Sequence, residues 1–290
     1  MSTNQTKAQR RDAARAEALA LQKKQQAREK RNRVLVLGGL ALAVIALGVA
    51  IWLILAESQK APMEKVENIP AGTVEQTGIP VGADGAAGTE NEGAKTLDVY
   101  VDYMCPICGQ FEQLNGASIT EMREAGDVTL IVHPVAILDR ASQGTEYSTR
   151  AAASAAWVAD RAPEQFNAYH EALFANQPEE NSPGLSDEQL AQIAQDAGVP
   201  ADVVGGISDG DAMDTYEEWV KAATGVAGDD PDVVNPETGS LGTPSVLVDG
   251  ERFAGWQTVG ALTEAITGEA AASEEPSAES SEEPSTEPSE

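Results

Sequence analysis

The sequence predicts an α/β domain that carries a helical insertion and follows one N-terminal transmembrane helix. Near the N-terminus, residues 34–56 include no charged side chain. Strand-like segments flank residues 143–226, and within 143–226 apolar residues recur at helical spacing. Strands interrupted by a block of helices are typical of a small central sheet with a helical insertion. The expected order is strand, helix, strand, helical block, hairpin and helix.

The first 56 residues predict a membrane anchor. Residues 1–33 hold ten Lys and Arg against three acidic residues, a net charge of +7, and residues 34–56 form the uncharged run. As a helix at ~1.5 Å per residue, that run spans about 34 Å, enough for the ~30 Å hydrocarbon core of a bilayer. The basic leader places the N-terminus in the cytoplasm and residues 57–290 on the extracytoplasmic side. A cleaved signal peptide is the alternative, although its apolar region would span only ~7–15 residues.

Two further segments lack the apolar pattern of a folded core. Residues 57–95 are rich in Gly, Ala and Pro, which predicts a flexible extracytoplasmic tether. Residues 269–290 contain eight Glu, six Ser and three Pro, which predicts a disordered acidic tail. The folded domain is therefore expected over residues 96–268, with its helical insertion at about 143–226.

The overall charge excludes one class of function. The 290 residues include 47 acidic and 19 basic side chains, for a formal net charge of −28. Because a nucleic-acid binder neutralises phosphates with Lys and Arg, a chain of this charge is not expected to bind nucleic acid.

The first elements of the domain are predicted from local patterns. Residues 96–103 and 127–138 are rich in β-branched and aromatic side chains, so both are expected to be strands, and Pro134 is expected to end the second. Between them, apolar residues spaced by three or four positions from Cys105 predict a helix. The dipeptide Asn115-Gly116 marks a candidate kink or interruption in that helix.

The remaining elements follow from helical spacing, caps and turn residues. Helices are expected over 147–162, 163–175, 186–197 and 211–224. Ser186 is the expected N-cap of the third, and Thr258 of a last helix that runs through Ile266. Residues 228–242 are rich in turn formers and predict a long loop. After it, Asp249-Gly250 predicts a hairpin between two short strands.

Cys105 and Cys108 are the only cysteines of the chain, and they lie in the motif Cys-Pro-Ile-Cys where a strand gives way to a helix. Unpaired backbone N–H groups and the helix dipole stabilise a thiolate at a helix N-terminus, so Cys105 is expected to be nucleophilic at neutral pH. Two intervening residues let Cys108 reach the sulfur of Cys105. Pro106 suits an early helical position, where its missing N–H costs little. The motif therefore predicts a redox-active pair.

Two structural roles for the cysteines compete with redox chemistry. A purely structural disulfide would restrict the unfolded chain little, because the loop that it closes is so short. Structural zinc would need two further ligands, and the only histidines, His133 and His170, lack the spacing of a zinc finger. We expect no metal site. We expect a structural role for His133, and either a surface position or packing for His170.

A proline far downstream makes the pattern specific. Pro244 directly precedes the first strand of the hairpin and is a candidate for a cis peptide bond with Thr243. With Cys-Pro-Ile-Cys after a strand, the insertion segment FNAYHEALF, and GTPSVLVDG before a terminal helix, residues 94–268 resemble the DsbA-like thiol:disulfide oxidoreductases of the thioredoxin superfamily, in the membrane-anchored form found in bacteria. The resemblance implies a thioredoxin-like fold with a helical insertion.

The resemblance also implies roles for individual residues. Cys105 would be the reacting sulfur and Cys108 its buried partner. Pro106 and Ile107 would tune the redox potential, with Ile107 replacing the histidine of the best-known members. Thr243 and Pro244 would form the cis-proline loop, where backbone groups of Thr243 pair with an extended substrate.

The function implied is the introduction of disulfides into exported proteins on the extracytoplasmic side of the membrane. The redox-active Cys105–Cys108 disulfide would need no other cofactor, and a quinone-coupled membrane partner of the DsbB or VKOR type would reoxidise it. Two alternatives stay open: a reductase or isomerase of exported protein disulfides, and a non-catalytic thioredoxin-like domain that binds peptides beside Pro244. The direction of electron flow depends on the potential, for which ~30 mV is already worth about 1.4 kcal/mol.

Overall fold

The computed structural model describes residues 62–268, together with Lys23 and Lys24. The predicted transmembrane helix at 34–56, the acidic tail at 269–290 and all of the leader except these two lysines lie outside the described residues. Within the described part of the chain, no helix is long and apolar enough to cross a membrane. Residues 62–268 belong to one compact unit.

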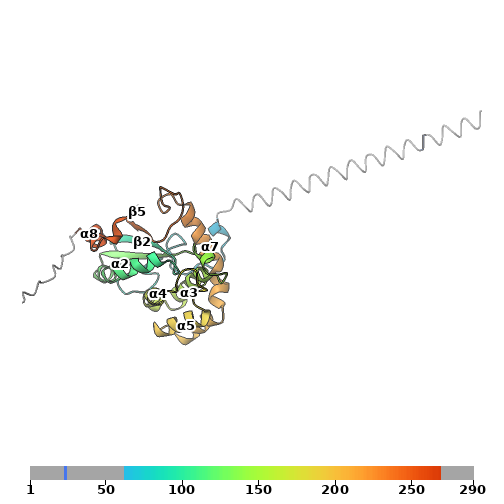
Figure 1. Cartoon of the computed structure of the whole chain (residues 1–290), viewed down its shortest axis with the longest axis horizontal. Helices are drawn as coiled ribbons and strands as arrows, with labels where there is room; N and C mark the ends of the chain where they lie inside the picture. The colour runs from blue at the N-terminus through green and yellow to red at the C-terminus, as the bar shows by residue number, and fades with distance from the viewer. Residues whose placement is uncertain (1–22, 25–61, 269–290) are drawn as a thin grey trace, which may run out of the picture. The chain divides into compact units, whose positions relative to one another are not determined.

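This unit contains a five-stranded sheet with the strand order β1-β3-β2-β4-β5. Figure 1 labels two of its strands, β2 and β5. The strands are β1 (Ile79–Val81), β2 (Lys95–Val101), β3 (Val128–Pro134), β4 (Ser245–Val248) and β5 (Glu251–Arg252). Only β2 and β3 run parallel among these pairs, and α2 (Pro106–Ala125) makes the crossover that a parallel pair requires. The predicted α/β class and the predicted hairpin are confirmed.

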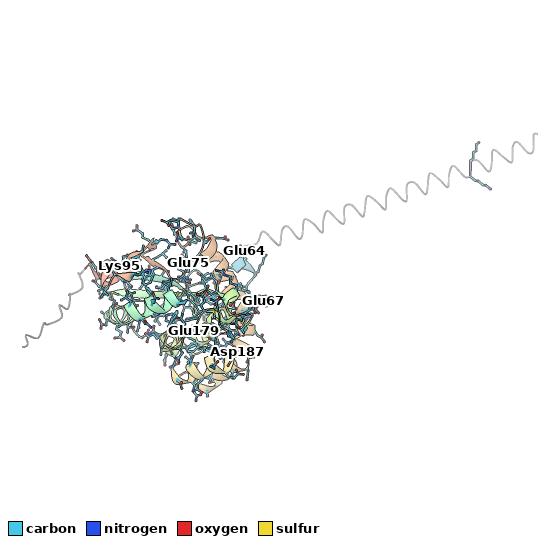
Figure 2. All side chains as sticks on the ribbon, in the orientation of Figure 1. Glu64, Glu67, Glu75, Lys95, Glu179 and Asp187 are labelled. Atoms are coloured by element: carbon cyan, nitrogen blue, oxygen red, sulfur yellow. The ribbon has the colours of Figure 1, made fainter. Side chains whose placement is uncertain are left out.

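The helical insertion follows β3 and a short 3₁₀ turn, η2 (Asp139–Ala141). Its helices are α3 (Tyr147–Arg161), α4 (Phe166–Ala175), α5 (Asp187–Asp196), α6 (Ala201–Ser208) and α7 (Asp211–Asp229). The predicted cap of α5 is confirmed, since Ser186 and Gln189 form a reciprocal capping box. At the same end, Asp187, which is labelled in Figure 2, pairs with Arg150 of α3 at 2.7 Å, and this pair ties α5 to the rest of the insertion.

Two parts of the insertion differ from the prediction. The sequence analysis assigns no element to α6, because Gly205-Gly206 weakens the helical pattern. Gly206 lies against Trp157, where a Cβ would come within 2.2 Å of the indole ring. Helix α7 continues past residue 224 into the predicted loop of 228–242, because Ala227 packs in a small apolar cluster with Val233.

Helix α2 is continuous, so Asn115-Gly116 does not interrupt it. The Asn115 side chain is buried, and its Nδ2 donates to the carbonyl oxygens of Phe111 and Trp256 at 3.1 and 3.2 Å. Because the bond to Trp256 reaches outside the helix, this residue joins α2 to the C-terminal segment.

The predicted cap at Thr258 is also wrong. The last helix, α8 (Ala261–Thr267), begins after Gly260, which has φ 78° and no side chain with which to cap. Thr258 lies in the preceding turn, where its N–H donates to the carbonyl of Gly255 at 3.0 Å. The left-handed conformation of Gly260 moves the start of the helix past the threonine.

Residues 62–95 belong to the folded domain, so the predicted tether at 57–95 is wrong for this stretch. β1 pairs with β3, and Met63, Ile79 and Val81 are buried. The indole Nε1 of Trp219 donates to the carbonyl of Gln76 at 2.7 Å, which holds the segment on α7. A three-residue strand carries too little pattern to be recognised, because its burial depends on β3 and α7, which come later in the chain.

Candidate active site

Cys105 and Cys108 lie at the junction of β2 and α2, on either side of Pro106 and Ile107. Cys105 occupies the N-cap position of α2, with φ −76° and ψ 114°, and Pro106 begins the helix. Both cysteines are free thiols. Cys105 keeps 6% of its surface exposed and Cys108 keeps 0%, so only Cys105 offers its sulfur to another molecule.

The cis-proline loop lies against the first cysteine. The Thr243-Pro244 peptide bond is cis, as the sequence predicts. The Cys105 thiol donates to the carbonyl oxygen of Thr243 at 3.3 Å, although 138 residues separate them. Ser245 then ties this loop to the turn-rich segment before it, since its hydroxyl donates to the carbonyl of Val233 at 3.0 Å. The fold thus brings the predicted site residues together.

The two thiols differ in acidity. A hydrogen bond with Cys108 is the largest cause that lowers the pKa of Cys105, from 9.0 to about 6, and the backbone N–H groups of Cys108 and Ile107 lower it further. Burial raises the pKa of Cys108 well above 9.0. At neutral pH the pair therefore holds a Cys105 thiolate and a Cys108 thiol, which makes Cys105 the nucleophile.

Alkylation of the reduced protein should reflect the difference between the pKa values of Cys105 and Cys108. Since the thiolate is the reacting form, the rate at which iodoacetamide modifies Cys105 should titrate with an apparent pKa near 6 and be roughly tenfold higher at pH 7 than at pH 5. Peptide mapping by mass spectrometry assigns the modified residue, and Cys108 should stay unmodified in the folded protein. A rate that rises only above pH 8 would contradict the assignment.

Asp102 is buried beneath this turn, and the sequence analysis assigns it no role. Its Oδ1 accepts from the backbone N–H of Met104 at 2.8 Å and the hydroxyl of Ser148 at 2.7 Å. Its Oδ2 accepts from the N–H groups of Ile137 and Leu138, both at 2.9 Å. Burial raises the pKa of Asp102 to about 6, although these four donors favour the carboxylate. One side chain thus holds the cysteine turn, the segment after β3 and helix α3 together.

Two side chains of the helical insertion also reach the cysteine turn. The sequence predicts neither of them as a site residue. Gln177 donates from Nε2 to the carbonyl oxygens of Tyr103 and Cys105 at 3.1 and 2.9 Å. The Nδ1 of His170 lies 2.9 Å from the Tyr103 hydroxyl, and its Nε2 lies 3.3 Å from Glu112 Oε1. No local pattern reveals these contacts, because each partner comes from a distant element.

His133 packs as the sequence predicts. It is buried, its Nε2 lies 2.9 Å from Asp98 Oδ1, and its ring stacks on Tyr100 with the centroids 4.1 Å apart. Among residues 62–268, no group of three or more His, Cys, Asp or Glu side chains is arranged to hold a metal ion.

Comparisons with known proteins agree with chemistry at the two thiols. A family model described as thioredoxin matches residues 86–267. The serine/threonine-protein kinase PknE of Mycobacterium tuberculosis is 29% identical over 126 residues, which is 42% of this chain and 22% of the kinase. The chain thus spans about a fifth of the length of the curated relatives that it matches.

Solved structures match over most of the domain. The MdbA protein of Actinomyces oris, a thiol-disulfide oxidoreductase, is 25% identical with a TM-score of 0.55, covering 73% of this chain and 97% of MdbA. The reduced DsbA of Mycobacterium tuberculosis is 28% identical with a TM-score of 0.51, covering 67% of this chain and 94% of DsbA. The family model covers more than half of the chain, so the chain belongs to the thioredoxin family, and its fold is similar to those of the thiol-disulfide oxidoreductases MdbA and DsbA.

Proposed function

We propose that this protein introduces disulfide bonds into exported proteins outside the cell membrane. The observation that carries the proposal is the difference between its two thiols, with the pKa of Cys105 lowered to about 6 and that of the buried Cys108 raised. A stabilised Cys105 thiolate stabilises the reduced state of the protein. The Cys105–Cys108 disulfide is then a stronger oxidant, because its reduction ends in that stabilised state.

The reaction begins with a substrate thiolate that attacks Sγ of Cys105 in the disulfide state. The bond between the two cysteine sulfurs breaks, and Cys108 leaves with the electron pair and takes up a proton, since burial disfavours its thiolate. A second substrate thiolate attacks the substrate sulfur of the mixed disulfide, and Cys105 leaves as a thiolate. The substrate gains a disulfide, and two electrons stay on the cysteine pair.

The substrate chain would bind beside Thr243. This residue lies in contact with Cys105, and the family resemblance implies that its backbone pairs with an extended peptide. Ile107 is 46% exposed next to the reacting sulfur and offers an apolar contact. Backbone pairing is independent of side-chain identity, which suits an enzyme that acts on many unfolded substrates.

We further propose that the predicted helix at 34–56 anchors the domain in the membrane. The ten Lys and Arg before that helix support an N-terminus in the cytoplasm and a folded domain on the extracytoplasmic side. A quinone-coupled membrane protein of the DsbB or VKOR type would take up the two electrons and restore the disulfide.

The reverse direction is the second candidate. Ile107 lies between the cysteines and is aliphatic, so its side chain has no hydrogen bond to offer the Cys105 thiolate. Without such a donor the Cys105–Cys108 disulfide would be a weaker oxidant. The protein would then act as a reductase or isomerase of exported protein disulfides.

The redox potential separates the two directions. We expect equilibration of the full-length protein with glutathione buffers to give a Cys105–Cys108 potential nearer to about −120 mV than to about −270 mV, the values of a strong oxidant and of thioredoxin. The oxidised protein should also speed the oxidative refolding of a reduced test protein, measured by its recovered activity. A potential near the thioredoxin value without any gain in refolding would reject the oxidase and favour the reductase.

A further inference from the structure

We propose that Gln177 is a positioning residue of the redox centre, whose side-chain amide holds the Tyr103–Cys105 turn and thereby favours the thiolate of Cys105. Gln177 lies just after helix α4 in the helical insertion, 72 residues from Cys105 along the chain. The inference rests on Cys105 as the reacting sulfur, and it is independent of the direction of electron flow.

The hydrogen bonds of Gln177 use the full donor capacity of its amide nitrogen. That nitrogen carries two hydrogens. It donates to the carbonyl of Tyr103 at 3.1 Å and to the carbonyl of Cys105 at 2.9 Å. The carbonyl of Cys105 also accepts the backbone N–H groups of Cys108 and Gly109, at 3.0 and 3.2 Å, which begin helix α2. Gln177 therefore connects the end of β2 with the first turn of α2.

The space for this side chain is left by Gly109. A Cβ on Gly109 would lie 2.5 Å from Gln177 Oε1, closer than nonbonded atoms approach. Glycine is among the least favourable residues in a helix interior, and Gly109 is the fourth residue of the 20-residue helix α2. A side chain at this position would therefore displace the Gln177 amide from its present place.

The effect on the sulfur is electrostatic and passes through the backbone. Carbonyl oxygens carry partial negative charge, and one of these two belongs to Cys105 itself. A donor on each oxygen offsets that charge, which lowers the cost of a thiolate nearby in a poorly hydrated site. The amide donates to carbonyl oxygens of the turn and acts on the sulfur only through them.

Three substitutions separate this effect from packing. Gln177→Met keeps the length of the side chain and removes the donors. Gln177→Glu keeps the shape and places a carboxylate against the two carbonyls. Gln177→Lys restores an N–H donor and adds a positive charge. If Gln177 only filled space, the Met variant would change the pKa of Cys105 little. The Glu and Lys variants would then change it to a similar extent.

The apparent pKa of Cys105 in each full-length variant is measured from the pH dependence of its alkylation by iodoacetamide. We expect the pKa of Cys105 to be highest in the Glu variant, lower in the Met variant and lower again in wild type. In the Lys variant it should equal the wild-type pKa or lie below it. At pH 5, below the wild-type pKa, the Met variant should react about threefold more slowly than wild type and the Glu variant about tenfold more slowly, because there one pKa unit changes the thiolate fraction about tenfold. Circular dichroism reports whether each variant is folded.

Gln143→Met is the matched control. Gln143 lies in the same insertion and donates from Nε2 to the carbonyl of Asn181, at an exposed site, so its loss should leave the Cys105 profile unchanged. Equal profiles for folded wild type, Met and Glu variants would overturn the proposal. If the Met and Glu variants do not fold, the Lys variant decides. A raised pKa of Cys105 in that variant would overturn the proposal, and a pKa at or below the wild-type value would support it. Slow alkylation of wild type at pH 6 would instead contradict the assignment of Cys105 as the nucleophile.

Discussion

Replacing Cys105 with alanine should abolish thiol-disulfide exchange, whereas replacing Cys108 should arrest it at a mixed disulfide. Cys105 is the thiol that keeps exposed surface and a lowered pKa, so its loss removes the attacking sulfur. In Cys108→Ala, Cys105 can still attack a substrate disulfide and release one substrate thiolate. The mixed disulfide then persists, because the buried sulfur that would displace the substrate is missing.

The two variants are compared with a disulfide-bonded test peptide on non-reducing gels and by mass spectrometry. Since the hydrogen bond with Cys108 is the largest cause of the low pKa of Cys105, trapping by Cys108→Ala should need a higher pH than the wild-type reaction does. Gln143→Met, at an exposed site, is a control that leaves both sulfurs in place. Exchange that survives in Cys105→Ala, or a trapped complex formed through Cys108, would contradict the assigned roles.

Replacing Asp102 with alanine should destabilise the domain by about 3 kcal/mol or more, because it leaves buried donors without a partner. The carboxylate is fully buried and accepts four hydrogen bonds, three of them from backbone N–H groups. Asp102→Asn should also be destabilising, since its NH₂ group would face an N–H donor at either oxygen position. Urea unfolding of the oxidised protein measures the free energy of unfolding without titrating thiols.

The same unfolding experiments test a pH dependence. Burial raises the pKa of Asp102 to about 6, above its usual 3.8, so between these values the folded protein binds a proton that the unfolded chain does not. The contribution of this group to stability should therefore rise as the pH falls from 6 toward 4, and it should vanish in Asp102→Asn. Asp127→Ala, at an exposed site, is the control and should change stability by less than ~0.5 kcal/mol. A similarly small effect of Asp102→Ala would refute the role assigned to this side chain.

Local chemistry explains the parts of the fold that the sequence predicts correctly. Pro106 begins α2, Ser186 caps α5, and Asp249-Gly250 turns the hairpin with positive φ at both residues. Each of these depends on a residue and its neighbours within a few positions. For the same reason the strand-to-helix junction around Cys105 could be located before the fold was known.

Contacts between distant segments explain where the structure differs from the sequence-based predictions. Asn115 favours a kink by its own propensity, yet its bond to Trp256, 141 residues away, fits it into a continuous helix. The stretch 62–95 has the composition of a tether, and β3 and α7 order it. Gln177 has no feature that marks it in the sequence, and only the packing of α4 beside the cysteine turn shows its two carbonyl partners.

The sequence by itself determined the α/β class, the order of most elements, the cysteine pair at the start of a helix and the proline that follows far downstream. Those features depend on spacing and on local backbone preferences. The tertiary structure alone decided which sulfur is exposed, that Thr243 lies on Cys105, and that Asp102 and Gln177 hold the turn between them. The physical reason is that thiol acidity depends on burial and on nearby donors, and at this site several of those come from elements far away in the chain.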